Sequence, residues 1–168
     1  MTSILKVSEI QDPTNGNTAL TVDTSGRIST PARPSFCARG YAGGVTGQGY
    51  QTTSYFSTVD HNIGNHFVNS SSTGAKFTAP IAGVYHMIYF MGLRAAHANF
   101  NAIHLTKNGS VYLEGWNTST NGTTHANATV STYMLLAVGD LIRAGWYTGY
   151  DAPSTGNQYG GFSGCFIG

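Results

Sequence analysis

Strand-forming segments separated by tight turns run along most of this chain, and one pair of them constrains the fold most. Residues 102–107 and 111–116 flank the dipeptide Asn108-Gly109. Both residues of that dipeptide tolerate the positive φ of a type I′ turn, so this is the strongest short signal of a β-hairpin. The sequence therefore predicts two antiparallel strands here.

Further strands are predicted at 35–41, 84–91, 129–137, 141–147 and 162–167, with a second tight turn at Val138-Gly139-Asp140. Only 9% of the 168 residues are charged, against roughly 25% in an average globular protein. Long surface helices need charge on their wet face, so a helical bundle is excluded. The sequence predicts an all-β protein, with sandwich, jelly roll and barrel as the open alternatives.

The first thirty residues form a separate segment. They contain two short apolar strands around the turn sequence DPTNGN, which together predict a β-hairpin. A two-stranded hairpin is not stable alone, so we interpret it as an arm that attaches to another chain or to the following domain. Pro31 and Pro34 make a stiff spacer, which divides the chain into an arm with its linker, 1–34, and a head domain, 35–168. The apolar residues expected to anchor the arm are Leu5, Val7, Ile10, Leu20 and Val22.

Charge and hydropathy exclude several classes of partner. The net charge is +1 and the basic residues are scattered, so no nucleic acid is expected. The apolar stretch 79–93 is shorter than a bilayer span and contains Pro80, so no membrane insertion is expected. The N-terminus lacks the pattern of a secretory signal, which predicts synthesis in a cytoplasm. Cys37 and Cys165 are interpreted as free apolar thiols, with a disulfide as the alternative.

No constellation of residues indicates an enzyme. The six histidines fit no zinc-binding frame, and Glu9 and Glu114 are the two glutamates of the chain. Asp60, Asp140 and Asp151 form no visible calcium-binding cluster. We expect no catalytic residues, no metal and no cofactor.

A family resemblance covers residues 35–168. The spacing F-x-x-P-x-x-G-x-Y-x-M-x-Y over 77–89, with Phe56, Asn62 and Phe67 upstream and Gly139-Asp140 and 162–166 downstream, resembles the trimeric globular head of the first complement component. That head belongs to the tumour necrosis factor-like jelly rolls. The resemblance implies a jelly-roll β-sandwich and a homotrimer around a three-fold axis. The interval from Phe67 to Phe77 is longer than in the family pattern.

The arm has a resemblance of its own. The segment SILKVSEIQDPTNGNTALTVDTSGRI is similar to the opening segment of structural proteins of tailed bacteriophages. The resemblance implies a virion component that is made in the cytoplasm of a bacterial host and docks on other virion proteins of the capsid or tail.

The strand at 84–91 is apolar on both faces, because Tyr85, Met87 and Tyr89 alternate with apolar Ile88 and Phe90. We expect one face to enter the core and the other to meet neighbouring subunits; the alternative is a strand covered on both sides by its own chain. His86 and His104 are expected at subunit contacts, where protonation near pH 6 would loosen a trimer. The residues assigned to the core or the trimer interface are Tyr85, Met87, Tyr89, Phe90, Phe162 and Phe166.

Strand alternation places the connections 94–100, 117–127 and 149–161 at one end of the domain and the tight turns at the other. The resemblance implies that 35–41 pairs antiparallel with the last strand, which adds the connection 42–49 to the first end and places the arm at the second. These connections are rich in Asn, Thr, Ser, Gly and Tyr, a composition that suits saccharide binding, or else only solvates the surface. We predict a capsid decoration or cement protein, with a tail-fibre tip that recognises a host surface glycan as the alternative. The candidate ligand-binding residues are Trp116, Asn117, Asn121, His125, Tyr147, Tyr150, Asn157 and Tyr159.

Overall fold

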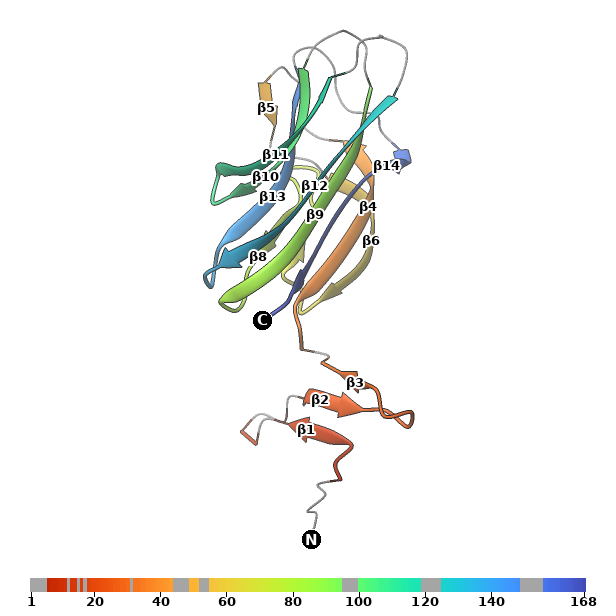
Figure 1. The fold of residues 1–168 in the computed structure, drawn as a ribbon, viewed down its shortest axis with the longest axis vertical. Helices are drawn as coiled ribbons and strands as arrows, with labels where there is room; N and C mark the ends of the chain where they lie inside the picture. The colour runs from red at the N-terminus through yellow and green to blue at the C-terminus, as the bar shows by residue number, and fades with distance from the viewer. Residues whose placement is uncertain are drawn as a thin grey trace. The chain divides into compact units, whose positions relative to one another are not determined.

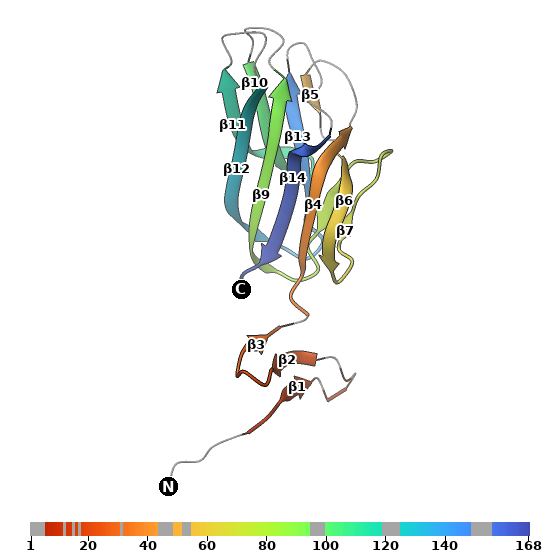
Figure 2. The ribbon, with the colours of Figure 1, turned by 90° about the vertical axis from the view of Figure 1, so that its right-hand side faces the viewer.

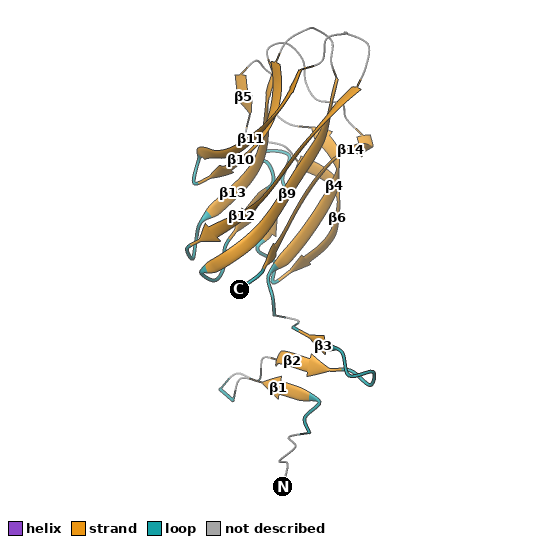
Figure 3. Ribbon diagram, viewed as in Figure 1, coloured by secondary structure: helices purple, strands orange, loops and turns teal. Residues whose placement is uncertain are grey.

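The structure is a computed structural model, and it divides the chain into two compact units, Met1–Arg33 and Pro34–Gly168. It describes residues 6–11, 13–14, 16, 18–30, 32–43, 49–51, 55–94, 100–118, 125–148 and 156–168. All regular elements among them are β-strands (Figure 3). The described residues therefore include no helix that could cross a membrane.

The first unit is a small antiparallel sheet of three strands, β1 (Glu9–Gln11), β2 (Thr18–Val22) and β3 (Ile28–Ser29). Asp23 fixes the turn between β2 and β3, because its carboxylate accepts hydrogen bonds from the backbone of Ser25 and Arg27 and pairs with the Arg27 guanidinium at 2.6 Å. The predicted hairpin thus has a third strand. A strand of two residues is too short to show a periodic pattern, so the sequence did not reveal it.

The second unit is a sandwich of two sheets (Figures 1 and 2). One sheet contains β5 (Gly49–Gln51), β7 (Phe67–Val68), β8 (Lys76–Thr78), β10 (Phe100–Lys107), β11 (Ser110–Thr118) and β13 (Leu141–Thr148). The other contains β4 (Ser35–Gly43), β6 (Tyr55–Ile63), β9 (Gly83–Arg94), β12 (His125–Leu136) and β14 (Gly156–Phe166). The first has the order β11-β10-β13-β8-β7, with β5 beside β13, and the second has the order β12-β9-β14-β4-β6. We call them the β10 sheet and the β9 sheet.

This arrangement confirms the all-β jelly roll and the seven strands predicted in the head domain. The pairing of β4 with the final strand β14 is antiparallel, as the family resemblance implied. The strands β5 to β8 were not predicted. Three of them have only two or three residues, and most of the exposed positions along β6 carry polar residues. Short or polar strands give little hydrophobic periodicity.

An aromatic cluster joins the two sheets in the core. The Phe36 ring stacks on Phe67 and Phe77, with centroid distances of 4.4 and 5.1 Å, and meets Phe162 edge-on at 4.8 Å. All four side chains are buried. Because β4 and β14 belong to the β9 sheet while β7 and β8 belong to the β10 sheet, these rings hold the two layers together.

The two tight turns lie together at one end of the sandwich. Asn108 and Gly109 have φ values of 52° and 86°, so the predicted positive φ at both positions is confirmed. The Asn108 side chain donates to the Asp140 carboxylate at 2.7 Å, and the Lys107 ammonium pairs with the same carboxylate at 2.9 Å. These contacts lower the pKa of Asp140 to about 2.

The other end of the sandwich is where β9, β10, β11, β12 and β13 border the long connections. The register places Arg94 opposite His125 and Phe100 opposite Thr118 there. The chain enters this unit at the turn end, because the Pro34 carbonyl accepts a hydrogen bond from Phe166, close to the C-terminus. Most of the predicted ligand-binding connections lie outside the described residues.

Candidate functional site

The outer face of the β9 sheet carries apolar side chains that remain exposed among the residues that the structure describes. Along β9, Tyr85, Met87 and Tyr89 point into the core and are fully buried, whereas Phe90 points outward and is 43% exposed. The two-faced pattern predicted for this strand is therefore present, and its second face is open in the single chain. This excludes the alternative of a strand covered on both sides by its own chain.

The residues predicted for core or interface separate into these two groups. Tyr85, Met87, Tyr89 and Phe162 are fully buried core residues. Phe166 packs against the edge of the core, with its ring 5.2 Å from that of Tyr85. Among the six, Phe90 is the outward residue, and a Cβ on Gly161 would collide with its ring at 2.4 Å. The ring thus lies over the backbone of β14.

Strand β12 adds two strongly exposed residues to the same face. Tyr133 is 65% exposed and Leu135 is 73% exposed. The Tyr133 ring stacks on His86 with a centroid distance of 4.8 Å, and the second ring nitrogen of His86, Nε2, lies 2.9 Å from the Ser131 hydroxyl. Sequence reasoning did not single out Tyr133 or Leu135, although their alternation with the buried Met134 and Leu136 was a usable signal.

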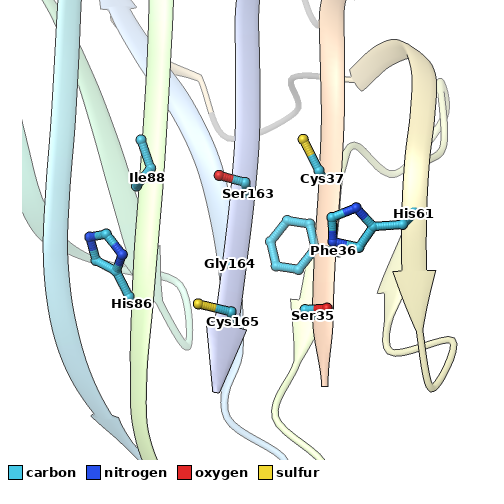
Figure 4. A pocket seen from close by; sticks show the side chains of 9 residues that line it. All are labelled: Ser35, Phe36, Cys37, His61, His86, Ile88, Ser163, Gly164 and Cys165. Atoms are coloured by element: carbon cyan, nitrogen blue, oxygen red, sulfur yellow. The ribbon is translucent and has the colours of Figure 1, made fainter. Parts of the chain in front are cut away.

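A pocket of about 300 Å³ opens on this face toward the turn end of the sandwich (Figure 4). Small side chains on β4 and β14 form its floor, and His86, Ile88 and His61 form its sides. Both free cysteines lie in it, which agrees with the prediction of unpaired thiols. The lining residues are Ser35, Phe36, Cys37, His61, His86, Ile88, Ser163, Gly164 and Cys165.

The structure places the two histidines predicted at subunit contacts in different environments, and it contradicts the prediction for His104. His86 lies on the open face, as a subunit contact requires. His104 lies on β10, in the other sheet, and is fully buried. Burial lowers the pKa of His104 to about 4, although Glu114 opposite it favours the charged form. His104 is therefore neutral near pH 6 and does not titrate there, contrary to the prediction.

Two of the predicted ligand-binding residues lie side by side at the end of the β10 sheet. Trp116 on β11 and Tyr147 on β13 are both register partners of Ala102 on β10, which lies between them. Because Ala102 carries only a methyl group, the two rings approach to a centroid distance of 6.0 Å with a tilt of 53°. Trp116 remains 53% exposed. This aromatic pair could stack against the apolar face of a sugar ring.

The other six predicted ligand-binding residues fall into two groups. Asn121 and Tyr150 lie outside the described residues. Asn117, His125, Asn157 and Tyr159 are placed as strand residues at the ends of β11, β12 and β14. Whether any of them binds a ligand stays a prediction.

The side chains assigned to anchoring the arm are partly exposed and partly half-buried. Val7 and Ile10 are exposed, and Ile28, which the prediction omitted, is exposed as well. Leu20 and Val22 on β2 are half-buried. Leu5 lies outside the described residues.

No metal centre is present among the described side chains, because no three His, Cys, Asp or Glu residues come together in them. The Cys37 thiol lies 3.9 Å from the Asp60 carboxylate, which in turn pairs with the Arg39 guanidinium at 2.9 Å. Burial, and then the Asp60 charge, raise the pKa of the Cys37 thiol. This thiol is protonated at neutral pH and is a weak nucleophile.

Two antiparallel sheets with this strand order define a jelly roll of the C1q and TNF-like class. The model of the C1q domain matches residues 39–167. The chain therefore belongs to the C1q domain family.

Solved structures of the same class share the fold at low identity. The globular domain of the zebrafish complement 1qA protein is 16% identical, with 81% of this chain and 98% of that chain covered and a TM-score of 0.56. A crystal structure of murine APRIL at pH 8.0 is 6% identical, with 80% and 99% covered and a TM-score of 0.62. Eiger TNF from S. frugiperda is 12% identical, with 82% and 94% covered and a TM-score of 0.59. No curated protein matches the chain.

Proposed function

We propose that the protein is a homotrimeric structural protein of a tailed-bacteriophage virion, a capsid decoration or cement protein anchored by its N-terminal arm. The observation that carries the trimer is the open outer face of the β9 sheet. Residues 83–92, 127–136 and 160–166, which supply most of that face, contain no Asp, Glu, Lys or Arg. Depletion of charge together with exposed aromatic side chains is characteristic of the centre of a protein interface.

The size of the face supports the same proposal. Five strands spaced about 4.8 Å apart and about nine residues long present roughly 700 Å². A standard stable interface takes roughly 600–1,000 Å² from each partner. The face is thus large enough for a specific subunit contact. Sedimentation equilibrium of the full chain tests this directly: a mass three times 17.8 kDa is expected, and a monomer at micromolar concentration would exclude the trimer.

Two features of the arm support attachment to the virion. Its sequence resembles the opening segment of phage structural proteins, and its three short strands leave Val7, Ile10 and Ile28 exposed. A sheet this small buries too little apolar surface to be stable without a neighbour. The proposed neighbour is another virion protein, and the proposed location of the protein is the virion, after synthesis in the bacterial cytoplasm.

Immunogold labelling of intact particles tests the assignment to the capsid. Label over the whole head is expected, and label confined to the tail would favour the alternative below. A full-chain Ile10→Asp variant tests the arm, because a charge on the anchoring surface should remove the protein from particles. Thr14→Asp, in the turn after β1, is the matched control and should be retained. Full retention of Ile10→Asp would contradict the anchoring role.

The Trp116–Tyr147 pair favours a second candidate function, the tip of a tail fibre that binds a host surface glycan. An aromatic platform flanked by hydrogen-bonding loops suits a saccharide, which has apolar ring faces and hydroxyl edges. A glycan array probed with the wild type and Trp116→Ala tests this candidate. Binding that is lost in the variant supports the fibre-tip function, and no binding by the wild type removes it.

A further inference from the structure

The pocket on the β9 sheet has a simple cause in the sequence. The outward residues of β4 and β14 along this stretch are Ser35, Cys37, Ser163 and Cys165, all of them small. The neighbouring strands present larger side chains, His61 on β6 and Ile88 on β9. A row of small residues between two rows of larger ones makes a trough (Figure 4).

The trough has an apolar base with a polar rim. Phe36 reaches beneath it because Gly164 has no side chain, and a Cβ there would lie only 2.7 Å from the Phe36 ring. The hydroxyls of Ser35 and Ser163 and the imidazole of His61 surround this base. An occupant should therefore be apolar, with one polar group at its edge, such as a leucine next to a tyrosine.

The same face of the same sheet carries such a pair. Tyr133 and Leu135 project from β12, the strand at the opposite edge of the β9 sheet from β6. A hollow and a projection at different places on one face form a heterologous contact, in which each copy fills the hollow of the next. Repeating this contact around a three-fold axis closes a ring of three.

We propose that Tyr133 and Leu135 of one copy fill the trough of a second copy and thereby shield Cys37 and Cys165. This inference rests on the proposed trimer. It adds that the chemical state of the two thiols, free or modified, decides whether the trimer assembles. In the separated subunit both thiols border open solvent; in the trimer the neighbour covers them. Modification of either thiol leaves a bulky group in the trough and blocks assembly.

Thiol–disulfide exchange with a small disulfide such as oxidised glutathione is one such modification. The cysteine thiolate attacks one sulfur, a protein–glutathione disulfide forms, and reduced glutathione leaves. The thiolate and not the thiol reacts, so Cys37 is the slower of the two cysteines, with Asp60 3.9 Å from its sulfur.

Thiol titration with 5,5′-dithiobis-(2-nitrobenzoate) tests the inference on the full chain. In the wild-type trimer both thiols should react at least ten times more slowly than in a Phe90→Arg monomer, whose substitution lies outside the trough. Cys37→Ser and Cys165→Ser assign each rate to one residue. A trimer whose thiols react as fast as those of the monomer would overturn this inference while the trimer stands. A wild-type chain that is monomeric would overturn the proposed trimer itself.

Cross-linking identifies the occupant. Leu135→Cys, or Tyr133→Cys as a second variant, is oxidised with oxidised glutathione, so that one disulfide forms for each glutathione disulfide reduced. Contact with the native cysteines of the next copy should give covalent trimers on a non-reducing gel, and Cys37→Ser/Cys165→Ser should abolish them. Covalent dimers that persist without the native cysteines would show contact between equivalent β12 strands and overturn the inference.

Discussion

The outer faces of the two sheets of the sandwich differ in how far side chains of the same chain cover them. In the β10 sheet, the outward residues Ala102, His104 and Thr106 of β10, which lies between β11 and β13, are buried. Long side chains of the flanking strands cover this strand, as Trp116 and Tyr147 do where they meet across Ala102. In the β9 sheet, the flanking residues on β14 and β4 are small, and Phe90 remains 43% exposed.

This difference shows which face is prepared for another subunit. A sheet that covers its own middle strand needs no partner there, and its polar and aromatic cover can face solvent or a ligand. The β9 sheet has one ion pair on this face, Arg39 with Asp60 at 2.9 Å, but its exposed apolar side chains on β9 and β12 gain free energy when a second chain removes them from water. In the proposed trimer, the β9 sheet is therefore the subunit side of the jelly roll and the β10 sheet is the solvent side.

The largest effect is expected where the two sheets share a core. Phe36→Ala removes the ring that contacts Phe67, Phe77 and Phe162, so the free energy of unfolding should fall by about 3–5 kcal/mol. Urea unfolding followed by tryptophan fluorescence measures it, since Trp146 is buried in the same core. Phe36→Leu is the control and should lose less. A loss below about 1 kcal/mol for the alanine variant would show that the cluster does not join the sheets.

A charge on each sheet sharpens the contrast between them. Phe90→Arg on the β9 sheet should raise the dissociation constant of the trimer by about 100-fold or more, because a buried interface does not tolerate an unpaired charge. Val68→Arg on the β10 sheet is the matched control, since Val68 is also an exposed apolar residue on a strand, and it should leave the trimer intact. Analytical ultracentrifugation over a dilution series distinguishes them, and equal effects of the two variants would remove the contrast.

The buried His104 makes the solvent-side sheet sensitive to acid. Its pKa is about 4 in the folded protein and 6.5 when unfolded, so between these values the unfolded chain binds a proton that the folded chain does not. Stability is therefore unaffected above pH 6.5 and is lost as the pH falls toward 4, by up to roughly 3 kcal/mol. The slope of urea-unfolding free energy against pH should flatten in His104→Gln. An unchanged slope would contradict the assignment.

The smallest effect on stability is expected for the contacts of Asp140 at the two tight turns. It develops at a lower pH than the effect of His104. The pKa of Asp140 is about 2 in the folded protein against 3.8 unfolded, so its contribution is present above pH 3.8 and is lost as the pH falls toward 2. Asp140→Asn should lower the Tm by a few degrees at pH 7 and should lose less on acidification than the wild type. Differential scanning calorimetry at pH 7 and pH 2.5 compares them. Parallel losses in both proteins would exclude Asp140 as the source.

Local patterns predicted the strands that later proved central. The turn at Asn108-Gly109 and the alternation along β9 follow from turn chemistry and from a period of two, which are properties of neighbouring residues, whereas the antiparallel pairing of β4 with β14 was implied by the family resemblance. The strands β5, β7 and β8 were missed because two or three residues do not establish a period. His104 was wrongly assigned to a subunit contact, because the alternation of residues along a strand shows which face of the sheet a side chain lies on and does not show what covers that face.

The amino-acid sequence by itself determined the fold class, the turn geometry and which residues of each strand share a face, because steric and hydrophobic preferences act over a few residues. Tertiary structure decided which faces stay open. The sequence marks Ser35, Cys37, Ser163 and Cys165 only as four small residues in two distant segments. They become one trough, with both thiols in it, because β4 and β14 pair at the centre of the β9 sheet, and such long-range pairing depends on the packing of the whole domain.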